Sequence, residues 1–166
     1  MDIDTGADVP LTLPAAAEAA LRACAGAWHE GEVAEGHLLQ ALAVAPDALA
    51  VRIGAYKFYF YRHRLNEAAD QALFCLRLAA RLLNVAGDWQ QVAPDHAAFD
   101  QLQPLPRLYL QCLLAYGYCR LRLGEAVEGR AVLLKAAELD PADRFGARRL
   151  VDVVDRGGVD EDDDDE

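Results

Sequence analysis

Apolar residues recur every three or four positions through most of this chain. That spacing places them on one face of an α-helix, whereas alternation at every second position would indicate strands. Helices are predicted over residues 14–28, about 33–45, 47–62, about 65–86, 105–123, about 126–139 and from 141 onward. Pro46 and Pro141 support two of these boundaries, because proline cannot continue a helix interior. The pattern therefore predicts an all-α protein.

The segment 105–123 has the most regular pattern. One apolar stripe consists of Leu105, Tyr109, Cys112, Tyr116, Cys119 and Leu123, and the opposite face holds Leu110, Leu114 and Leu121. Two apolar faces indicate a central helix that is buried on two sides. The last helix has a single stripe, formed by Ala147, Leu150, Val151 and Val154, so it should cover the open end of a stack. For that helix we expect Asp140 at the N-cap and Pro141 as the first residue.

An aromatic run, residues 55–64, lies in the third predicted helix and holds five aromatic side chains. Aromatic residues also favour strands, but the helical spacing on both sides of the run and the lack of a hairpin turn favour a helix. We expect Lys57, Phe60 and Tyr61 to face a partner. Packing against neighbouring helices is expected instead for Tyr56, Phe58 and Tyr59. If all five rings were buried, the run would only fill the core.

Residues 87–105 form an irregular insert, longer than the connections found in most compact domains. We expect Gly87 to cap the preceding helix, and a short helix to run from Asp95 to Leu102. Two interpretations are open for the insert as a whole. It is either packed onto the helices by Trp89 and Phe99, or it carries a function.

Charge is concentrated at the two ends of the chain. The net charge is −11, and subtracting the seven acids of residues 160–166 and the three of residues 1–12 leaves −1 for residues 13–159. We expect a disordered acidic lead-in over 1–13, a helical domain over 14–157 and a disordered acidic tail over 158–166. The tail either solubilises the protein or screens cations near Lys57, Arg62 and Arg64. A nearly neutral body argues against nucleic-acid binding.

We predict the cellular compartment from the lack of a membrane-spanning helix and of a secretory signal in the sequence. Charged residues interrupt every apolar stretch before the roughly 20 residues that a membrane-spanning helix needs, so no membrane insertion is expected. An acidic start is unlike a secretory signal, and we expect a cytoplasmic protein. Its cysteines, Cys24, Cys75, Cys112 and Cys119, form no C-x-x-C pair. They read as small core residues, with a redox or metal role as the alternative.

Two six-residue segments repeat each other. They are Gly31-Glu32-Val33-Ala34-Glu35-Gly36 and Gly124-Glu125-Ala126-Val127-Glu128-Gly129, and each precedes a helix that ends at a proline. A small sixth residue would let two helices approach closely. In these features the chain resembles the tetratricopeptide repeat (TPR) family, whose units are helix hairpins of 34 residues. The resemblance implies a short TPR-like α-solenoid of three helix hairpins plus a C-terminal capping helix, with helix two short by two residues against the third unit.

The resemblance to TPR proteins also implies a binding site, because the inner helices of that family line a concave groove that receives a peptide or a partner's helix. The groove residues implied here are Trp28, His29, Ile53, Lys57, Phe60, Tyr61, Gln111, Leu114, Tyr118 and Arg122. Aromatic walls with a few cations or amides suit a peptide. A second resemblance, carried by residues 57–64 and 106–124, is to small repeat proteins found beside nitrogen-fixation genes.

The leading hypothesis is a non-enzymatic scaffold, an adaptor or chaperone that binds a protein or peptide partner without cofactor, metal or catalytic residues. It depends on the repeat pattern, and on the lack of a nucleophile–base arrangement, a phosphate loop or metal-ligand spacing. One alternative is a secretion-type chaperone for a hydrophobic client, which the acidic ends favour. The other is an enzyme that uses Trp89, Asp95, His96 and Asp100 of the insert as an acid/base cluster.

Overall fold

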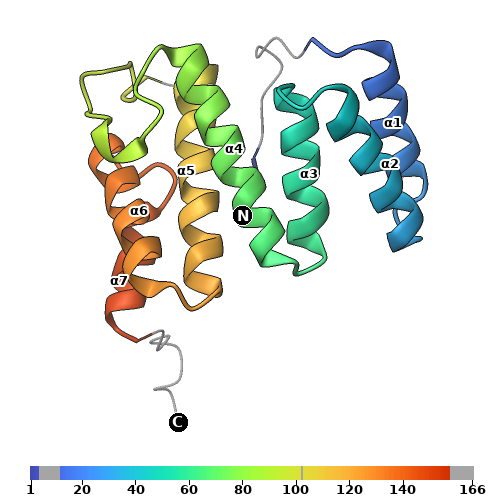
Figure 1. The fold of residues 1–166 in the computed structure, drawn as a ribbon. Helices are drawn as coiled ribbons and strands as arrows, with labels where there is room; N and C mark the ends of the chain where they lie inside the picture. Colours follow the sequence, from blue (N-terminus) through green and yellow to red (C-terminus); the bar gives the residue numbers. More distant parts are fainter. Residues whose placement is uncertain (4–11, 102, 158–166) are drawn as a thin grey trace.

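The computed structural model describes residues 1–3, 12–101 and 103–157, and these ranges contain seven α-helices, one short 3-10 helix and no strand (Figure 1). The helices are α1 (Ala15–Gly26), α2 (Gly31–Val44), α3 (Leu49–Tyr61), α4 (Leu65–Leu83), the 3-10 helix η1 (Trp89–Gln91), α5 (Pro104–Arg122), α6 (Ala126–Leu139) and α7 (Ala147–Asp155). The predicted all-α class is confirmed.

Consecutive helices pack as three hairpins, α1 with α2, α3 with α4, and α5 with α6 (Figure 1). Helix α7 packs on α6 and closes that end of the stack, as its single apolar stripe predicted. The second and third hairpins join through a close contact between α4 and α5, whereas the first hairpin meets α3 over a smaller area. The protein is therefore a helical-repeat stack with a capping helix.

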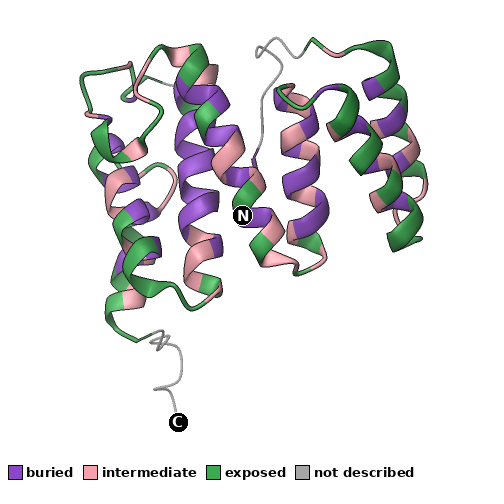
Figure 2. Cartoon of the chain, in the orientation of Figure 1, coloured by how far each residue is buried: buried purple, intermediate pink, exposed green. Residues whose placement is uncertain are grey.

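Helix α5 lies at the centre of the hydrophobic core. Every residue from Leu108 to Gly117 is buried, and Figure 2 shows this helix buried along most of its length. It can be buried so completely because α4 packs on one side and α6 on another. The two apolar faces of the sequence pattern predicted this position.

The register of the repeat differs from the one that the two six-residue segments suggested. Gly31 is the first residue of α2, whereas Gly124 has a φ of 81° and lies in the turn before α6. The structural counterpart of Gly129 is therefore Ala34, the fourth residue of its helix. Both residues are buried, while Gly36 is exposed. Helix α2 is not short either, since α2 and α6 both have 14 residues.

The fourth residue of α4, Ala68, completes this set. Its backbone N–H bonds to the carbonyl of Arg64 at 3.0 Å, as those of Ala34 and Gly129 bond four residues back to Glu30 and Glu125 at 2.9 Å. Ala34 and Ala68 are fully buried. Small side chains at this position let the two helices of each hairpin approach closely, which is the role the sequence had suggested for Gly36.

Two helix ends differ from the predicted boundaries by three residues or more. Helix α4 ends at Leu83 because Asn84 takes a left-handed conformation with a φ of 58°, so Asn84 and not Gly87 forms the cap. Helix α7 begins at Ala147 and not at Pro141. The carboxylate of Asp140 accepts a bond from the Phe145 N–H at 3.2 Å and holds residues 140–146 in a turn.

The insert contains no helix over its described residues 95–101, which form turns. Its regular element is η1, where the Asp88 carboxylate accepts a hydrogen bond from the Gln90 N–H at 3.0 Å. The insert is packed onto the helices, because Val92 is fully buried and Phe99 is 2% exposed. Lys135 of α6 also donates to the Val92 carbonyl at 2.9 Å.

The first three residues lie against the helices, within the segment that was expected to be a disordered lead-in. Ile3 is fully buried and belongs to the main hydrophobic core. Most of the remaining lead-in, residues 4–11, and the acidic tail, residues 158–166, lie outside the described residues. Within the described ranges, none of the helices is both long and apolar enough to cross a membrane.

Replacing Gly129 by alanine should destabilise the fold, because the new Cβ would lie 2.9 Å from the backbone nitrogen of Leu121 and 2.8 Å from its Cγ. We expect the free energy of unfolding to fall by about 1–3 kcal/mol, which is the usual range for overpacking. Gly36→Ala is the matched control, since nothing lies within 4 Å of its Cβ position. It should be neutral or stabilise by up to about 1 kcal/mol, because alanine favours helices. Urea denaturation measures both, and equal effects would contradict the proposed register.

Candidate functional site

The aromatic run forms the second half of α3 and divides into buried and accessible rings. Tyr56, Phe58 and Tyr59 are 0%, 1% and 5% exposed. Phe60 is half-buried, whereas Tyr61 is 59% exposed. This division agrees with the one predicted from helical spacing, and it leaves two rings of the run available at the surface.

The accessible rings of α3 meet the end of α5. The ring centroids of Phe60 and Tyr118 are 6.1 Å apart, and those of Phe60 and Tyr61 are 5.8 Å apart with an edge-on geometry. Lys57 lies one turn before Tyr61 on α3, and Arg122 one turn after Tyr118 on α5. We call these five residues, Lys57, Phe60, Tyr61, Tyr118 and Arg122, the aromatic site.

Two cations flank the rings of the aromatic site. Arg122 donates a hydrogen bond to the Tyr118 hydroxyl at 2.9 Å, and its guanidinium lies 5.7 Å from the centre of that ring. No carboxylate of the described residues lies within salt-bridge distance of Arg122. The ammonium of Lys57 lies 3.6 Å from the Asp2 carboxylate, with both side chains substantially exposed. The site therefore has a positive charge at each end.

Tyr56 supports the aromatic site from the core. Its ring stacks on Phe60, with centroids 5.5 Å apart and planes inclined by 29°. Its hydroxyl donates a hydrogen bond of 2.6 Å to the carbonyl oxygen of Met1. Burial raises the pKa of Tyr56 well above its usual value, so the hydroxyl stays protonated and remains a donor.

This arrangement suits recognition of a protein segment. Aromatic side chains offer a large contact area at a low cost in conformational entropy, and the flanking cations can hold carboxylates. The rings and cations project from two helices that are packed into the core, so their positions are fixed before any partner binds.

Three of the ten predicted groove residues lie in the core instead. Ile53, Gln111 and Leu114 are 6%, 9% and 4% exposed, so they do not reach a partner in this structure. Gln111 and Leu114 are buried because other helices enclose α5, and Ile53 is part of the main hydrophobic core to which α3 contributes. Helix α5 reaches solvent only near its two ends, where Arg107 and Arg122 are exposed.

Trp28 and His29 lie in the turn after α1, in a separate cluster. The Trp28 ring meets Phe58 edge-on at 5.6 Å, and Phe58 lies about 200° around the helix from Phe60. The Arg62 guanidinium lies 4.4 Å from the centre of the Trp28 ring and 3.8 Å from that of Phe58, and it donates to the Trp28 carbonyl. His29 is exposed beside this cluster.

Arg64 is also bound within the protein. It pairs with the Glu35 carboxylate at 2.7 Å and with Glu67 at 3.0 Å, and the Tyr59 hydroxyl contacts Glu35 at 3.2 Å. The hydrogen bond from Arg64 lowers the pKa of the Glu35 carboxyl. Arg62 and Arg64 are therefore held by several close internal contacts, whereas Lys57, whose side chain is 39% exposed like that of Arg64, has a longer contact of 3.6 Å with Asp2.

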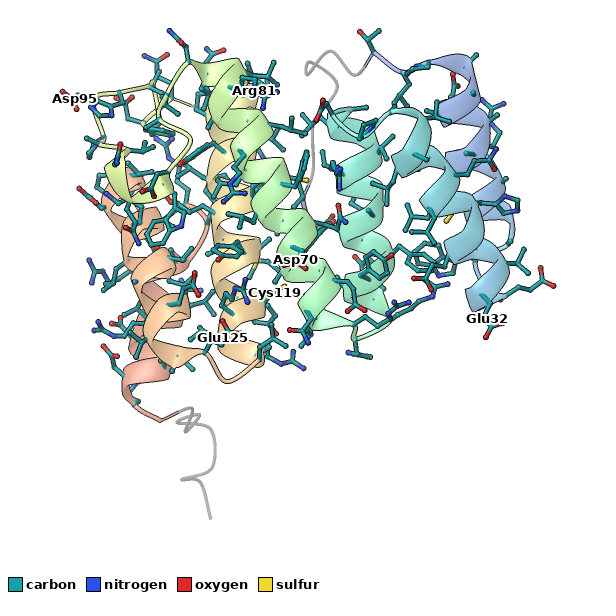
Figure 3. All side chains as sticks on the ribbon, viewed as in Figure 1. Glu32, Asp70, Arg81, Asp95, Cys119 and Glu125 are labelled. Carbon is teal, nitrogen blue, oxygen red and sulfur yellow. The ribbon has the colours of Figure 1, made fainter. Side chains whose placement is uncertain are left out.

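Of the four residues of the suggested acid/base cluster, Asp95 and His96 lie near each other, with the Asp95 carboxylate 4.0 Å from His96 Nε2. Asp95 points outward from the insert (Figure 3), and the Nδ1 atom of His96 accepts a hydrogen bond from the Ala93 N–H at 3.1 Å. Trp89 instead lines a cavity of about 430 Å³ together with Arg77, Tyr116 and Glu128. Asp95, His96 and Asp100 are exposed.

The four cysteines are free thiols and all are buried. Burial and the neighbouring Cys75 thiol raise the pKa of Cys112. Burial also raises the pKa of Cys119, which is labelled on α5 in Figure 3, to about 11. No group of three or more His, Cys, Asp or Glu residues suited to a metal ion occurs among the described residues.

Met1–Ile3 are the residues of this region that sequence reasoning missed. A short acidic segment far from α3 in sequence carries no periodic pattern, and only Ile3 could have indicated burial. The role of Tyr56 as a hydrogen-bond donor to this segment depends on the same long-range contact. In the structure, the segment joins the aromatic site through Tyr56 and Lys57.

The fold and this surface define an all-α helical-repeat protein with an exposed aromatic site. A protein of Azotobacter chroococcum mcd 1, described as "Uncharacterized 19.8 kDa protein in nifW 5'region", is 41% identical over 123 residues, which cover 73% of this chain and 69% of the relative. The chain belongs to the family of this protein. The match supports the second resemblance drawn from the sequence. No protein-family model matches the chain, so membership of the TPR family stays a prediction, and no solved structure matches it.

The burial of the aromatic run predicts losses of stability of very different size for alanine variants of Tyr61 and Tyr56. Tyr61→Ala should change the free energy of unfolding by less than about 1 kcal/mol, because the ring is mostly exposed. Tyr56→Ala should lower it by about 3–5 kcal/mol, the range for deleting a buried aromatic ring. Urea denaturation provides the measurement. Similar losses for both variants would show that Tyr61 is part of the core.

The buried thiol of Cys119 should make the fold sensitive to alkaline pH. Its pKa is raised from about 9 to about 11, so the unfolded chain loses this proton before the folded chain does. Ionisation of this thiol therefore leaves the free energy of unfolding unchanged below pH 9. Between pH 9 and pH 11 it lowers the free energy of unfolding, by up to about 3 kcal/mol at 1.36 kcal/mol per pKa unit. Urea denaturation at pH 8 and pH 10.5 should show a smaller loss for Cys119→Ala than for the wild type. An identical loss would contradict the role of this thiol.

Proposed function

We propose that this protein is a non-enzymatic interaction scaffold that binds a segment of another protein at the aromatic site. The observation that carries the proposal is the exposed Tyr61 ring beside half-buried Phe60 and Tyr118, with Lys57 and Arg122 at the two ends. A single exposed aromatic residue would need no explanation. Three adjacent accessible rings with flanking cations on rigid helices form a site that resembles binding hot spots.

The proposed setting is nitrogen fixation. The Azotobacter relative is described by its position in the nifW 5' region, and the alignment includes most of this chain. The partner of the scaffold would then be a protein that the host produces when it fixes nitrogen. An adaptor or chaperone role fits a chain whose aromatic site presents accessible aromatic rings and positively charged side chains.

The choice of a peptide or helix as partner follows from the shape and charge of the site. Cations at both ends of a row of rings can pair with acidic side chains of one extended or helical segment. Arg122 is suited to this task, because it has no carboxylate partner among the described residues and a guanidinium binds carboxylates in a fixed geometry.

The test is capture of partners from the native host grown under nitrogen-fixing conditions. Tagged wild type should retain a discrete set of proteins, and the double variant Tyr61→Ala/Arg122→Ala should lose at least 90% of them as judged by quantitative mass spectrometry. The loss should occur without unfolding, because both side chains are exposed. Circular dichroism would verify that the variant is folded.

The matched control is Leu39→Ala, which removes a side chain that is 52% exposed on α2, in the first hairpin. This variant should retain the same proteins as the wild type. If the partner list is the same for all three proteins, the aromatic site is not the binding surface.

A further inference from the structure

Residues Met1–Ile3 make three kinds of contact beside the aromatic site. The Met1 carbonyl accepts a hydrogen bond of 2.6 Å from the Tyr56 hydroxyl, the Asp2 carboxylate lies 3.6 Å from the Lys57 ammonium, and the Ile3 side chain is fully buried. Tyr56 and Lys57 are neighbours on α3, so this helix supplies both polar contacts. The main core, of which α3 is a part, also contains Ile3.

These contacts are of the kind that a bound peptide makes with a receptor. A backbone carbonyl meets a fixed donor, an acidic side chain meets a cation and an aliphatic side chain fills an apolar site. The buried Ile3 anchors the segment by packing. The hydroxyl of fully buried Tyr56 gains the partner that a buried polar group requires from a backbone oxygen 55 residues away, as a receptor side chain does with a peptide backbone.

The segment is also placed to influence the aromatic site. Lys57 is one of the two flanking cations, and Asp2 partly neutralises it. Tyr56, which holds Met1, stacks on Phe60 at 5.5 Å, and Phe60 meets Tyr118. A partner that engages Lys57 and this side of Phe60 therefore has to compete with the first three residues.

We propose that Met1–Ile3 occupy one end of the ligand site, and that the external ligand is an extended peptide with an acidic residue followed by a branched aliphatic residue. This inference rests on the proposed function and specifies its partner. The chain's own segment is tethered, so it competes at an effective concentration in the millimolar range. If it fills the site nine-tenths of the time, the apparent affinity for an external peptide is reduced about tenfold.

The experiment measures binding of the synthetic peptide Met-Asp-Ile-Gly-Ser-Gly, labelled with a fluorophore at its C-terminus, by fluorescence anisotropy. The full-length variant Ile3→Asp should bind the peptide at least tenfold more tightly than the wild type, because a carboxylate at position 3 cannot enter the apolar site. A control peptide with Asp in place of Ile should bind neither protein. Equal affinity of the Met-Asp-Ile peptide for the two folded proteins, or no binding to either, would overturn the proposal.

A charge exchange tests the contact between Asp2 and Lys57 in the same assay. Adding Lys57→Glu to the Ile3→Asp variant should weaken peptide binding severalfold, and a peptide with Lys in place of Asp should restore it. If the peptide with Lys does not bind the Lys57→Glu variant more tightly than the peptide with Asp does, the proposed role of the contact between Asp2 and Lys57 is wrong. If Ile3→Asp does not fold by circular dichroism, Ile3→Gly replaces it, since it also removes the side chain that anchors the segment.

The outcome separates this inference from the proposed function. If the peptide fails to bind the folded Ile3→Asp variant while capture of host proteins still depends on Tyr61 and Arg122, the scaffold function stands and the ligand assignment is wrong. If the peptide binds Ile3→Asp and capture does not depend on Tyr61 and Arg122, the peptide site is real and the aromatic site is not the partner surface.

Discussion

The close approach of the two helices in each hairpin is the constraint on which the rest of the structure depends. It is permitted by a small buried residue at the fourth position of the second helix, which is Ala34, Ala68 or Gly129. The tightest case is Gly129, where a Cβ would lie 2.9 Å from the Leu121 backbone nitrogen. Gly117 of α5 is also confined, because its Cβ would lie 3.0 Å from the Leu133 side chain of α6. These contacts bring α6 close enough to α5 to enclose it, together with α4.

The enclosure of α5 decides which of its side chains reach solvent, and so where the proposed partner could bind. Residues 108–117 are buried, so α5 reaches solvent only near its two ends, at Arg107 near the start and at half-buried Tyr118 and exposed Arg122 near the last turn. On α3, Phe60 is half-buried, Tyr61 is exposed and the Lys57 side chain is 39% exposed. The aromatic site lies where these two helix ends emerge from the core. Its rings are held by packing from behind, and such preorganisation lowers the entropic cost of binding.

Internal contacts also differ among the cationic side chains near the aromatic site. Five cations lie in or near the aromatic run and the end of α5, but they do not have equal freedom. Arg120 pairs with Glu125 at 3.1 Å. Arg62 lies against the Trp28 and Phe58 rings, and Arg64 pairs with Glu35 and Glu67. Arg122 contacts only a tyrosine among the interactions described above, and Lys57 has a loose contact with Asp2. Among these cations, Lys57 and Arg122 are therefore the two that close carboxylate or backbone contacts hold least.

The sequence by itself determined the helices, the hairpin order, the capping role of α7 and the exposure of Tyr61 beside buried Tyr56, because each follows from a local 3.6-residue period. Tertiary structure decided the rest. Gly36 and Gly129 look equivalent in sequence, yet Ala34 takes the buried position. The reason is that Gly31 begins its helix, whereas Gly124 lies in a left-handed turn before the next helix. The burial of Gln111 and the docking of Ile3 depend on which helices meet across the stack. Such contacts join residues far apart in the chain and leave no periodic signal in the sequence.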